Sequence, residues 1–360
     1  MEIGSIFEIN VKELFKEGNK AFYLPFMDKK AYSYNKFFNT GRSAIEFLLK
    51  KAISISKDSK ILLPAFTCPS IIDAVSRSGF NHEFYSITDE FQLDINSIEN
   101  KLENVKIIYV IQYFGGYLNQ ESYDFLKKLQ SQSIIIIEDI THSLYTKHPN
   151  FIGFGDYILG SIRKWLPIPD GAFLSSTNYI PDLPIEGSCN EYSFYSFAAQ
   201  VMKGIYLQDT ELNKNQYLML NQKAIDSLFS DYKIRNITSI SWRYLSSYNM
   251  EILIEQRIHN YDYLVERTKK FSFIKPIFPR LEGQVPFGFV VLSKQRDKLF
   301  NYLIKNDIYC NIHWKLTNEF NNIDEVSRKL SERILTIPCD QRYGKKEMDY
   351  IIRTLESFKE

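Results

Sequence analysis

The segment 133–143 reads SIIIIEDITHS, and it decides the fold prediction. Its four consecutive isoleucines, Ile134–Ile137, are typical of a strand buried on both faces. Strand-sized apolar runs also occur at Lys60–Leu63 and Val105–Gln112, and segments with helical spacing lie between the runs. This alternation predicts an α/β fold in which helices sandwich a mostly parallel sheet. Ligands bind beyond the carboxyl ends of such strands, so the residues after each strand are the candidate site residues.

The pattern changes in the second half of the chain. It weakens from Leu183 to Ser247, and a long helix is then expected at Met250–Lys270. A strand at Gln284–Leu292 and a helix at Arg296–Asn306 are expected to follow. We therefore predict two domains, a large one over residues 1–245 and a small α+β C-terminal domain over residues 246–360.

Composition excludes several classes of protein. The 360 residues carry 44 Lys plus Arg against 43 Asp plus Glu, so the basic excess of a nucleic-acid-binding protein is absent. No stretch approaches the roughly 18 apolar residues of a membrane helix, and the N-terminus lacks a secretory pattern. The four cysteines stand far apart and predict neither a metal site nor a disulfide framework. We expect a soluble cytoplasmic protein that binds no metal, nucleic acid or membrane.

A pair of carboxylates follows the isoleucine run. Glu138 and Asp139 end this apolar strand, and Thr141 and His142 follow them. A carboxylate buried in this position is costly unless it is paired, so a cationic partner is expected. The alternative interpretation is a helix cap or a structural salt bridge.

A lysine and a phosphate-binding turn complete the pattern. Ser161 and Lys164 follow a short strand at Tyr157–Gly160 and are flanked by apolar residues. A lysine in apolar surroundings can form a Schiff base. The alternative is that Arg163 and Lys164 are simply a pair of solvated basic residues. Thr40–Ala44 (TGRSA) opens a helix with small residues, as phosphate-binding turns do. A phosphate seat, a buried carboxylate and a reactive lysine are what pyridoxal 5′-phosphate (PLP) requires.

These motifs, in this order, resemble fold-type I PLP enzymes of the aspartate-aminotransferase-like fold. More narrowly, the chain is similar to DegT/StrS-type sugar-nucleotide aminotransferases, as a divergent member. Independent landmarks in the C-terminal part support the resemblance, which spans about residues 35–357. The segments that carry it are Thr40–Ala44, Pro64–Cys68, Glu138–Ser143, Lys164, Arg257–Tyr261, Val285–Phe287, His313-Trp314 and Ile334–Tyr343.

The resemblance implies roles for individual residues. Asp139 would bind the pyridine nitrogen, Lys164 would form the Schiff base, and His142 would lie near the ring oxygen O3′ or the substrate. Gly41, Arg42 and Ser161 would hold the phosphate. Thr67 and Cys68 follow the strand that usually supplies the side chain that stacks on the cofactor ring, and Phe66, Tyr113 or Phe114 are the alternatives for this stacking. His313 and Trp314 would line the substrate cleft, or they would simply be packed in the small domain.

The implied activity is transfer of an amino group from glutamate or glutamine to a keto sugar linked to a nucleoside diphosphate. Such a reaction serves surface-polysaccharide or amino-sugar biosynthesis, and the resemblance implies a homodimer. Three alternatives remain: a PLP enzyme acting on an amino acid or small keto compound, a dehydratase, and a non-catalytic homologue. Lys164 favours aminotransfer over dehydration, because family dehydratases typically carry His at this position.

Overall fold

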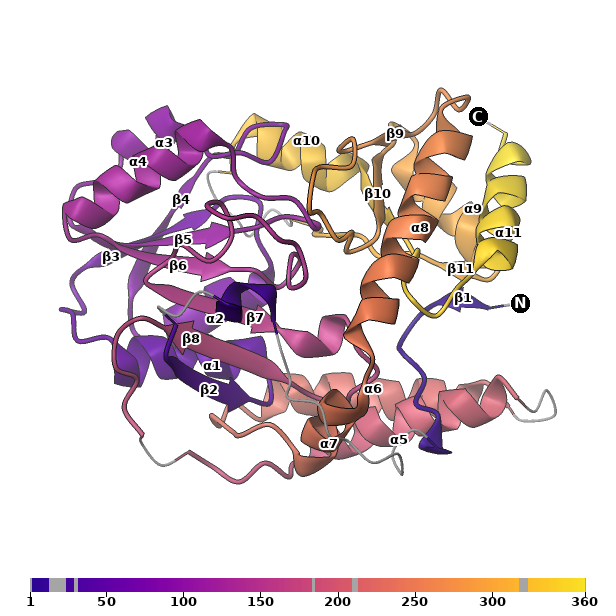
Figure 1. Ribbon diagram of the computed structural model, residues 1–360, viewed down its shortest axis with the longest axis horizontal. Helices are drawn as coiled ribbons and strands as arrows, with labels where there is room; N and C mark the ends of the chain where they lie inside the picture. Colours follow the sequence, from indigo (N-terminus) through magenta and orange to yellow (C-terminus); the bar gives the residue numbers. More distant parts are fainter. Residues whose placement is uncertain are drawn as a thin grey trace. The chain divides into compact units, whose positions relative to one another are not determined.

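The computed structural model describes residues 2–12, 24–28, 32–182, 185–208, 213–316 and 323–359 (Figure 1). The chain divides into two compact units. The first unit comprises Met1–Ser5, Ile55–Gly155 and Asn249–Glu360, and the second comprises Ile6–Ser54 and Asp156–Tyr248. The predicted boundary between residues 245 and 246 stays a prediction.

The first unit contains the parallel strands that the isoleucine run predicts. The strands are β3 (Lys60–Pro64), β4 (Asn81–Tyr85), β5 (Val105–Ile111) and β6 (Ile135–Asp139), and each neighbouring pair is parallel. Their order is β6-β5-β3-β4. Along the chain, β4 is therefore added on one side of β3, and β5 and β6 are added on the other side. This reversal makes the space between the ends of β3 and β5 a topological switch point, where α/β proteins bind ligands.

Helices connect these strands, as a parallel arrangement requires. They are α2 (Pro69–Arg77), α3 (Ile95–Glu99) and α4 (Gln120–Ser131), and α3 and α4 lie on one side of the strands in Figure 1. Side chains of Asp94 and Asn119 cap α3 and α4 by accepting hydrogen bonds from backbone N–H groups of the first turn. The α/β fold class predicted from the sequence is confirmed.

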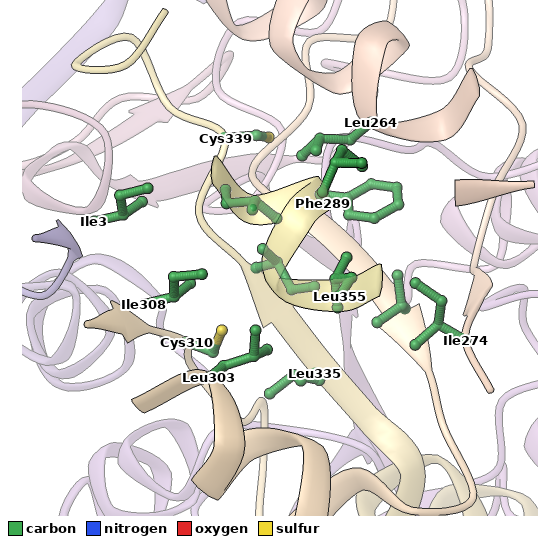
Figure 2. Close-up of a cluster of buried hydrophobic side chains, with 14 of the residues drawn as sticks. Ile3, Leu264, Ile274, Phe289, Leu303, Ile308, Cys310, Leu335, Cys339 and Leu355 are labelled. Carbon is green, nitrogen blue, oxygen red and sulfur yellow. The ribbon is translucent and has the colours of Figure 1, made fainter. Parts of the chain in front are cut away.

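The C-terminal part of the first unit has its own apolar core (Figure 2). A three-stranded antiparallel sheet in the order β12-β10-β9 contributes Phe289 and Leu335, and helices contribute Leu264, Leu303 and Leu355. The strand expected at Gln284–Leu292 is shorter, since β10 spans Phe289–Leu292 and Pro286 has no N–H to give to a ladder. The elements are α8 (Met250–Thr268), β9 (Lys275–Pro276), β10, α9 (Arg296–Lys305), β11 (Ile308–Tyr309), α10 (Glu325–Arg333), β12 (Ile334–Ile337) and α11 (Lys345–Glu356).

The N-terminal strand belongs to this same core. β1 (Ile3–Gly4) pairs in parallel with β11, and Ile3 is buried among the core side chains (Figure 2). Gly4 has a φ of +94°, and a Cβ there would lie 2.2 Å from the carbonyl oxygen of Tyr309. Only glycine fits this approach, so the register of β1 depends on Gly4.

Two residues of α8 fasten the segment that follows β12. The Arg257 guanidinium donates to the carbonyl oxygen of Phe287 at 2.9 Å and to the side chain of Gln341 at 2.7 Å. The Asn260 amide donates to the carbonyl oxygens of Cys339, Asp340 and Tyr343. These bonds join two of the segments that carry the resemblance, Arg257–Tyr261 and Ile334–Tyr343.

The second unit has antiparallel strands and a pair of long helices. Strand β8 (Ala172–Ser176) pairs with both β7 (Tyr157–Ser161) and β2 (Tyr34–Phe38). Helix α1 (Gly41–Phe47) continues into the π-helical turn η3 (Leu48–Ala52). The region of weak pattern is helical, with α5 (Glu191–Tyr206), α6 (Asn215–Ser230) and α7 (Ser239–Ser247), and α5 lies beside α6 (Figure 1). A short 3-10 helix, η2, spans Pro25–Asp28.

Within the part of the chain that the structure describes, none of the helices is both long enough and apolar enough to cross a membrane.

Candidate active site

The candidate residues of the first unit follow the strands on either side of the switch point. Thr67 and Cys68 come after β3, Phe114 comes after β5, and Asp139 ends β6 with His142 behind it. Because β3, β5 and β6 are parallel, their carboxyl ends meet at one edge. The sequence prediction that chemistry-bearing residues gather at strand ends therefore agrees with this topology.

The strand pleat sends Glu138 and Asp139 to opposite faces, since successive side chains alternate. Glu138 pairs with Val110 in the register and therefore shares a face with Gln112. The Gln112 amide donates to Glu138 at 2.9 Å, and the backbone N–H groups of Gly153, Phe154 and Gly155 also donate to it. Burial raises the pKa of Glu138, and these hydrogen bonds oppose the rise. The role of Glu138 is therefore structural: it holds the loop of residues 153–155 in place.

Asp139 lies on the other face, which it shares with Tyr109. The Tyr109 hydroxyl donates to Asp139 Oδ2 at 2.7 Å, and the backbone N–H of Thr141 donates to Oδ1 at 2.8 Å. Burial and the nearby Asp139 carboxylate both raise the pKa of Tyr109, so the phenol keeps its proton and remains a donor. A carboxylate offers about four lone-pair sites, and these two bonds leave acceptor capacity for a ligand.

The cationic partner expected for these carboxylates is not found among the described side chains. Neither Glu138 nor Asp139 forms an ion pair with a described Lys or Arg, and backbone N–H groups, an amide and a phenol stabilise them instead. The expectation was wrong for Glu138, because hydrogen bonds alone satisfy its oxygens. For Asp139, the ring nitrogen of a bound cofactor can supply the missing positive charge.

His142 is packed in a stack of aromatic rings. Its imidazole lies 4.3 Å from the Phe287 ring centroid at 22°, 5.0 Å from Phe114 at 23°, and 5.4 Å from Trp314 at 18°. The side chain is buried, with 2% of its surface exposed. This packing fixes the plane of the imidazole. The sequence could not predict the stack, since Phe287 and Trp314 belong to distant segments.

The loop after β5 reaches Phe287 through a close backbone approach. Gly115 has a φ of +93°, and a Cβ there would lie 2.5 Å from the carbonyl oxygen of Val285. The Thr146 hydroxyl donates to the Gly115 carbonyl at 2.7 Å and accepts from the Val285 N–H at 3.1 Å. These contacts hold the 285–287 segment against the residues that follow β5.

His313 and Trp314, the two predicted substrate-cleft residues, are next to this stack. The His313 ring lies edge-on to His142 with centroids 5.3 Å apart, and its Nδ1 is 2.9 Å from the Thr336 hydroxyl. Trp314 also packs on Phe66, with centroids 5.3 Å apart. The structure thus brings His142, His313 and Trp314 together. Whether they bind substrate stays a prediction.

Thr67 and Cys68 differ in their surroundings. The Thr67 hydroxyl is fully buried and finds no hydrogen-bond partner among the described residues. Buried hydroxyls are normally satisfied, so this one is suited to a bond with a ligand. Cys68 is partly exposed, and its Sγ lies 3.0 Å from the Ser70 hydroxyl.

In the second unit, two of the predicted phosphate-binding residues are adjacent. Gly41 begins α1 and Ser161 ends β7, and a Cβ built on Gly41 would lie 4.0 Å from the Ser161 Cβ. Thr40 caps α1 through a hydrogen bond from the Ser43 N–H at 3.1 Å. The structure therefore brings together Gly41 and Ser161, which are far apart in the sequence.

The Arg42 side chain points elsewhere. Its guanidinium donates to the carbonyl oxygen of Leu228 and lies over the rings of Phe229 and Tyr232, with distances of 5.2 and 5.7 Å to their centroids. In this arrangement Arg42 ties α1 to the end of α6. The phosphate role of Arg42 stays a prediction.

Lys164 lies on a turn that is anchored at several points. It ends the 3-10 turn η4 (Ile162–Lys164), which follows β7 directly. The N–H groups of Ile162 and Arg163 donate to the carbonyl oxygen of Gly171, and the Gly171 N–H donates to Asn39. The backbone that carries Lys164 is therefore held by the loop before β8.

Asp170 is a buried residue that the sequence analysis did not assign. Its carboxylate accepts from the hydroxyls of Ser193 and Ser241 at 2.6 Å each and from the Thr238 hydroxyl at 2.9 Å. Burial raises its pKa, while these hydrogen bonds oppose the rise. Asp170 thus fastens the starts of α5 and α7 to the loop after Lys164. No sequence motif marks this role.

No metal-ligating cluster of three or more His, Cys, Asp or Glu side chains occurs within the described ranges.

Residues 24–157 match the model of the DegT/DnrJ/EryC1/StrS aminotransferase family. The resemblance read from the sequence is confirmed. This match contains the turn at Gly41, the segment 64–68 and the Glu138-Asp139 pair, whereas Lys164 lies beyond it.

Two characterised relatives align with the chain at low identity. The UDP-4-amino-4,6-dideoxy-N-acetyl-beta-L-altrosamine transaminase of Campylobacter jejuni is 22% identical over 343 residues, 89% of this chain and 84% of the relative. The histidinol-phosphate aminotransferase of Buchnera aphidicola is 26% identical over 224 residues, 62% of this chain. The match covers only 54% of that second relative, about half its length.

Solved structures show the same fold. Helicobacter pylori PseC, an aminotransferase involved in pseudoaminic acid biosynthesis, matches 99% of this chain and 100% of its own with a TM-score of 0.69 and 15% identity. An Escherichia coli GDP-4-keto-6-deoxy-D-mannose-3-dehydratase with bound hydrated PLP matches 99% of this chain and 100% of its own with a TM-score of 0.66 and 16% identity. The fold is thus shared by aminotransferases and a dehydratase.

The Thr67 hydroxyl gives a first test of these assignments. In Thr67→Val we expect PLP affinity to fall about tenfold, because one hydrogen bond to the ligand is lost, while the apoprotein's free energy of unfolding changes by less than about 0.5 kcal/mol. Spectroscopic PLP titration and urea unfolding measure the two quantities.

Thr146→Val is the matched control, since both threonines are fully buried. Here the Gly115 carbonyl and Val285 N–H lose their partner, so we expect a loss of about 1–3 kcal/mol in stability. Unchanged PLP affinity in Thr67→Val would contradict the assignment of Thr67.

Proposed function

We propose that this chain is a PLP-dependent aminotransferase that moves an amino group from glutamate or glutamine to a keto sugar linked to a nucleoside diphosphate. The observation that carries the proposal is the buried Asp139, which has a phenol and a backbone N–H as partners and acceptor capacity for a ring nitrogen. The match of residues 24–157 to an aminotransferase family supports it.

The residues present fit the cofactor. The Asp139 carboxylate suits a protonated pyridine nitrogen, the buried Thr67 hydroxyl suits a ligand acceptor, and the Gly41 and Ser161 pair suits a phosphate. When bound, PLP supplies an electron-withdrawing ring that stabilises negative charge at the donor's Cα.

The chain's own residues would then perform distinct tasks. The Asp139 carboxylate keeps the ring nitrogen protonated. The Lys164 amine would hold the cofactor and, once the donor amine replaces it, would take the donor's Cα proton and return it to the cofactor carbon C4′. His142, held in plane by Phe114 and Phe287, orients the ring oxygen or the substrate.

The nucleotide-sugar acceptor is supported by the relative from Campylobacter jejuni, which is a transaminase of a UDP-linked amino sugar and aligns with most of this chain. We propose amino-sugar or surface-polysaccharide biosynthesis as the role. The proposal includes a homodimer, as the family resemblance implies, and a cytoplasmic location, as the composition of the sequence leads us to expect.

A second candidate is transamination of a small keto compound. It is favoured by the alignment with a histidinol-phosphate aminotransferase, which has the higher identity of the two relatives but covers a smaller part of this chain. Both candidates use the same cofactor and differ in the acceptor.

Lys164 provides the test of the cofactor chemistry. We expect Lys164→Ala to lose the visible absorbance of the lysine-bound cofactor and to lower aminotransfer at least a hundredfold, because the amine that holds PLP and moves the proton is gone. Absorbance spectra and coupled assays with glutamate measure both effects.

Arg163→Ala is the control for this variant, since it removes the adjacent cation, whose guanidinium lies 5.7 Å from the Tyr192 ring centroid. It should retain the visible band. If Lys164→Ala also retains the band, another residue carries the cofactor and the lysine assignment fails. A wild-type protein that binds no PLP would support the non-catalytic alternative.

The acceptor is tested with nitrogen-15-labelled glutamate and two panels of keto compounds. One panel contains nucleotide-linked keto sugars, and the other contains small phosphorylated and free keto acids and ketones. Mass spectrometry should find the label in an amino sugar of the first panel. Label found only in the second panel would contradict the sugar acceptor and support the second candidate.

A further inference from the structure

A cavity of about 670 Å³ lies in the first unit. It lies within the range of roughly 300–1,000 Å³ that small-molecule sites occupy. Its walls come from residues 272–275, from Leu292 at the end of β10 and residues 293–295 after it, from one side of α10, and from Asp89. None of the residues proposed for PLP or the sugar lines it.

The cavity is strongly basic. Lys275, Lys294, Lys329 and Arg333 line it, against the single acid Asp89. Lys329 forms an ion pair with Glu325 at 2.5 Å. The other three cations are exposed and form no ion pair with the described residues. Because the whole chain carries a net charge of only +1, this gathering of positive charge is local and favours an anionic ligand.

The start of α9 adds to the positive charge around the cavity. Gln295 is its N-cap residue and lines the cavity, and no side chain caps the helix. The uncapped N–H groups of this ten-residue helix keep their partial positive charge, and the acid in its first turn, Asp297, forms an ion pair with Arg296 at 2.7 Å. This contribution comes from the backbone and is independent of the lysines and the arginine.

The remaining wall is apolar. Phe273, Ile274, Leu292, Val326 and Leu330 contribute it. Phe273 is fixed against Phe358, with ring centroids 5.0 Å apart. A bare phosphate would leave this surface in water, whereas a ligand with a flat apolar part would cover it.

We propose that this cavity is an accessory site for a nucleoside phosphate. The phosphates lie against Lys275, Lys294 and Arg333 near the start of α9, and the base packs on the apolar wall around Phe273. The inference concerns binding at a separate place and goes beyond the proposed function.

The test is a fluorescence titration of the holoenzyme with the N-methylanthraniloyl derivative of ADP. We expect saturable binding in the wild type and at least tenfold weaker binding in the double variant Lys294→Ala/Arg333→Ala. Inorganic pyrophosphate should compete, but at least tenfold less well than ADP, because it lacks the base.

Arg328→Ala is the matched control, as Arg328 is an exposed arginine of α10 that does not line the cavity. It should bind the probe within about twofold of wild type. Thermal unfolding of all variants checks that they are folded. Equal binding by the double variant and wild type would place the nucleotide elsewhere and overturn the proposal, as would no binding at millimolar probe. Pyrophosphate competing as well as ADP would overturn the nucleoside part.

Discussion

The structure of the first unit depends on one constraint: two adjacent carboxylates end a strand that is otherwise apolar. Burying them is costly, so each needs partners on its own face of the sheet. Glu138 obtains them from Gln112 and the backbone of residues 153–155, which fixes the loop after β6. Asp139 obtains them from Tyr109 and Thr141, and it keeps lone pairs for a ligand. One carboxylate thus serves the fold and its neighbour is free to serve chemistry.

The same edge of the sheet is stiffened by aromatic packing and by close backbone contacts. The rings around His142 fill the space beyond β5 and β6, and Gly115 lets the chain approach Val285 where no other residue fits. Arg257 then joins Phe287 to the segment after β12. Rigid supporting contacts of this kind are what catalytic groups need to remain in position.

Sequence reasoning was most successful where the physics is local. The isoleucine run and the strand-end carboxylates are readable because they depend on neighbours in the chain. The stack around His142 and the tie between Asp170 and Ser193, Thr238 and Ser241 join distant segments, so periodicity cannot reveal them. The expectation of a cation beside Glu138 was wrong for a related reason. Backbone N–H groups stabilise this carboxylate instead, and such groups have no signature in the sequence. Helices α5–α7 were missed because their exposed faces include apolar residues such as Phe194 and Met219, which blur the helical period.

In the function we propose, the Asp139 carboxylate keeps the ring nitrogen of the bound cofactor protonated. Nitrogen-15 NMR of the protein reconstituted with ring-labelled PLP tests it most directly, since the chemical shift of a pyridine nitrogen reports its protonation. We predict a protonated nitrogen in the wild type and in Glu138→Gln, and an unprotonated nitrogen in Asp139→Asn, because an amide cannot stabilise the positive charge. A protonated nitrogen in Asp139→Asn, or an unprotonated one in the wild type, would contradict the account.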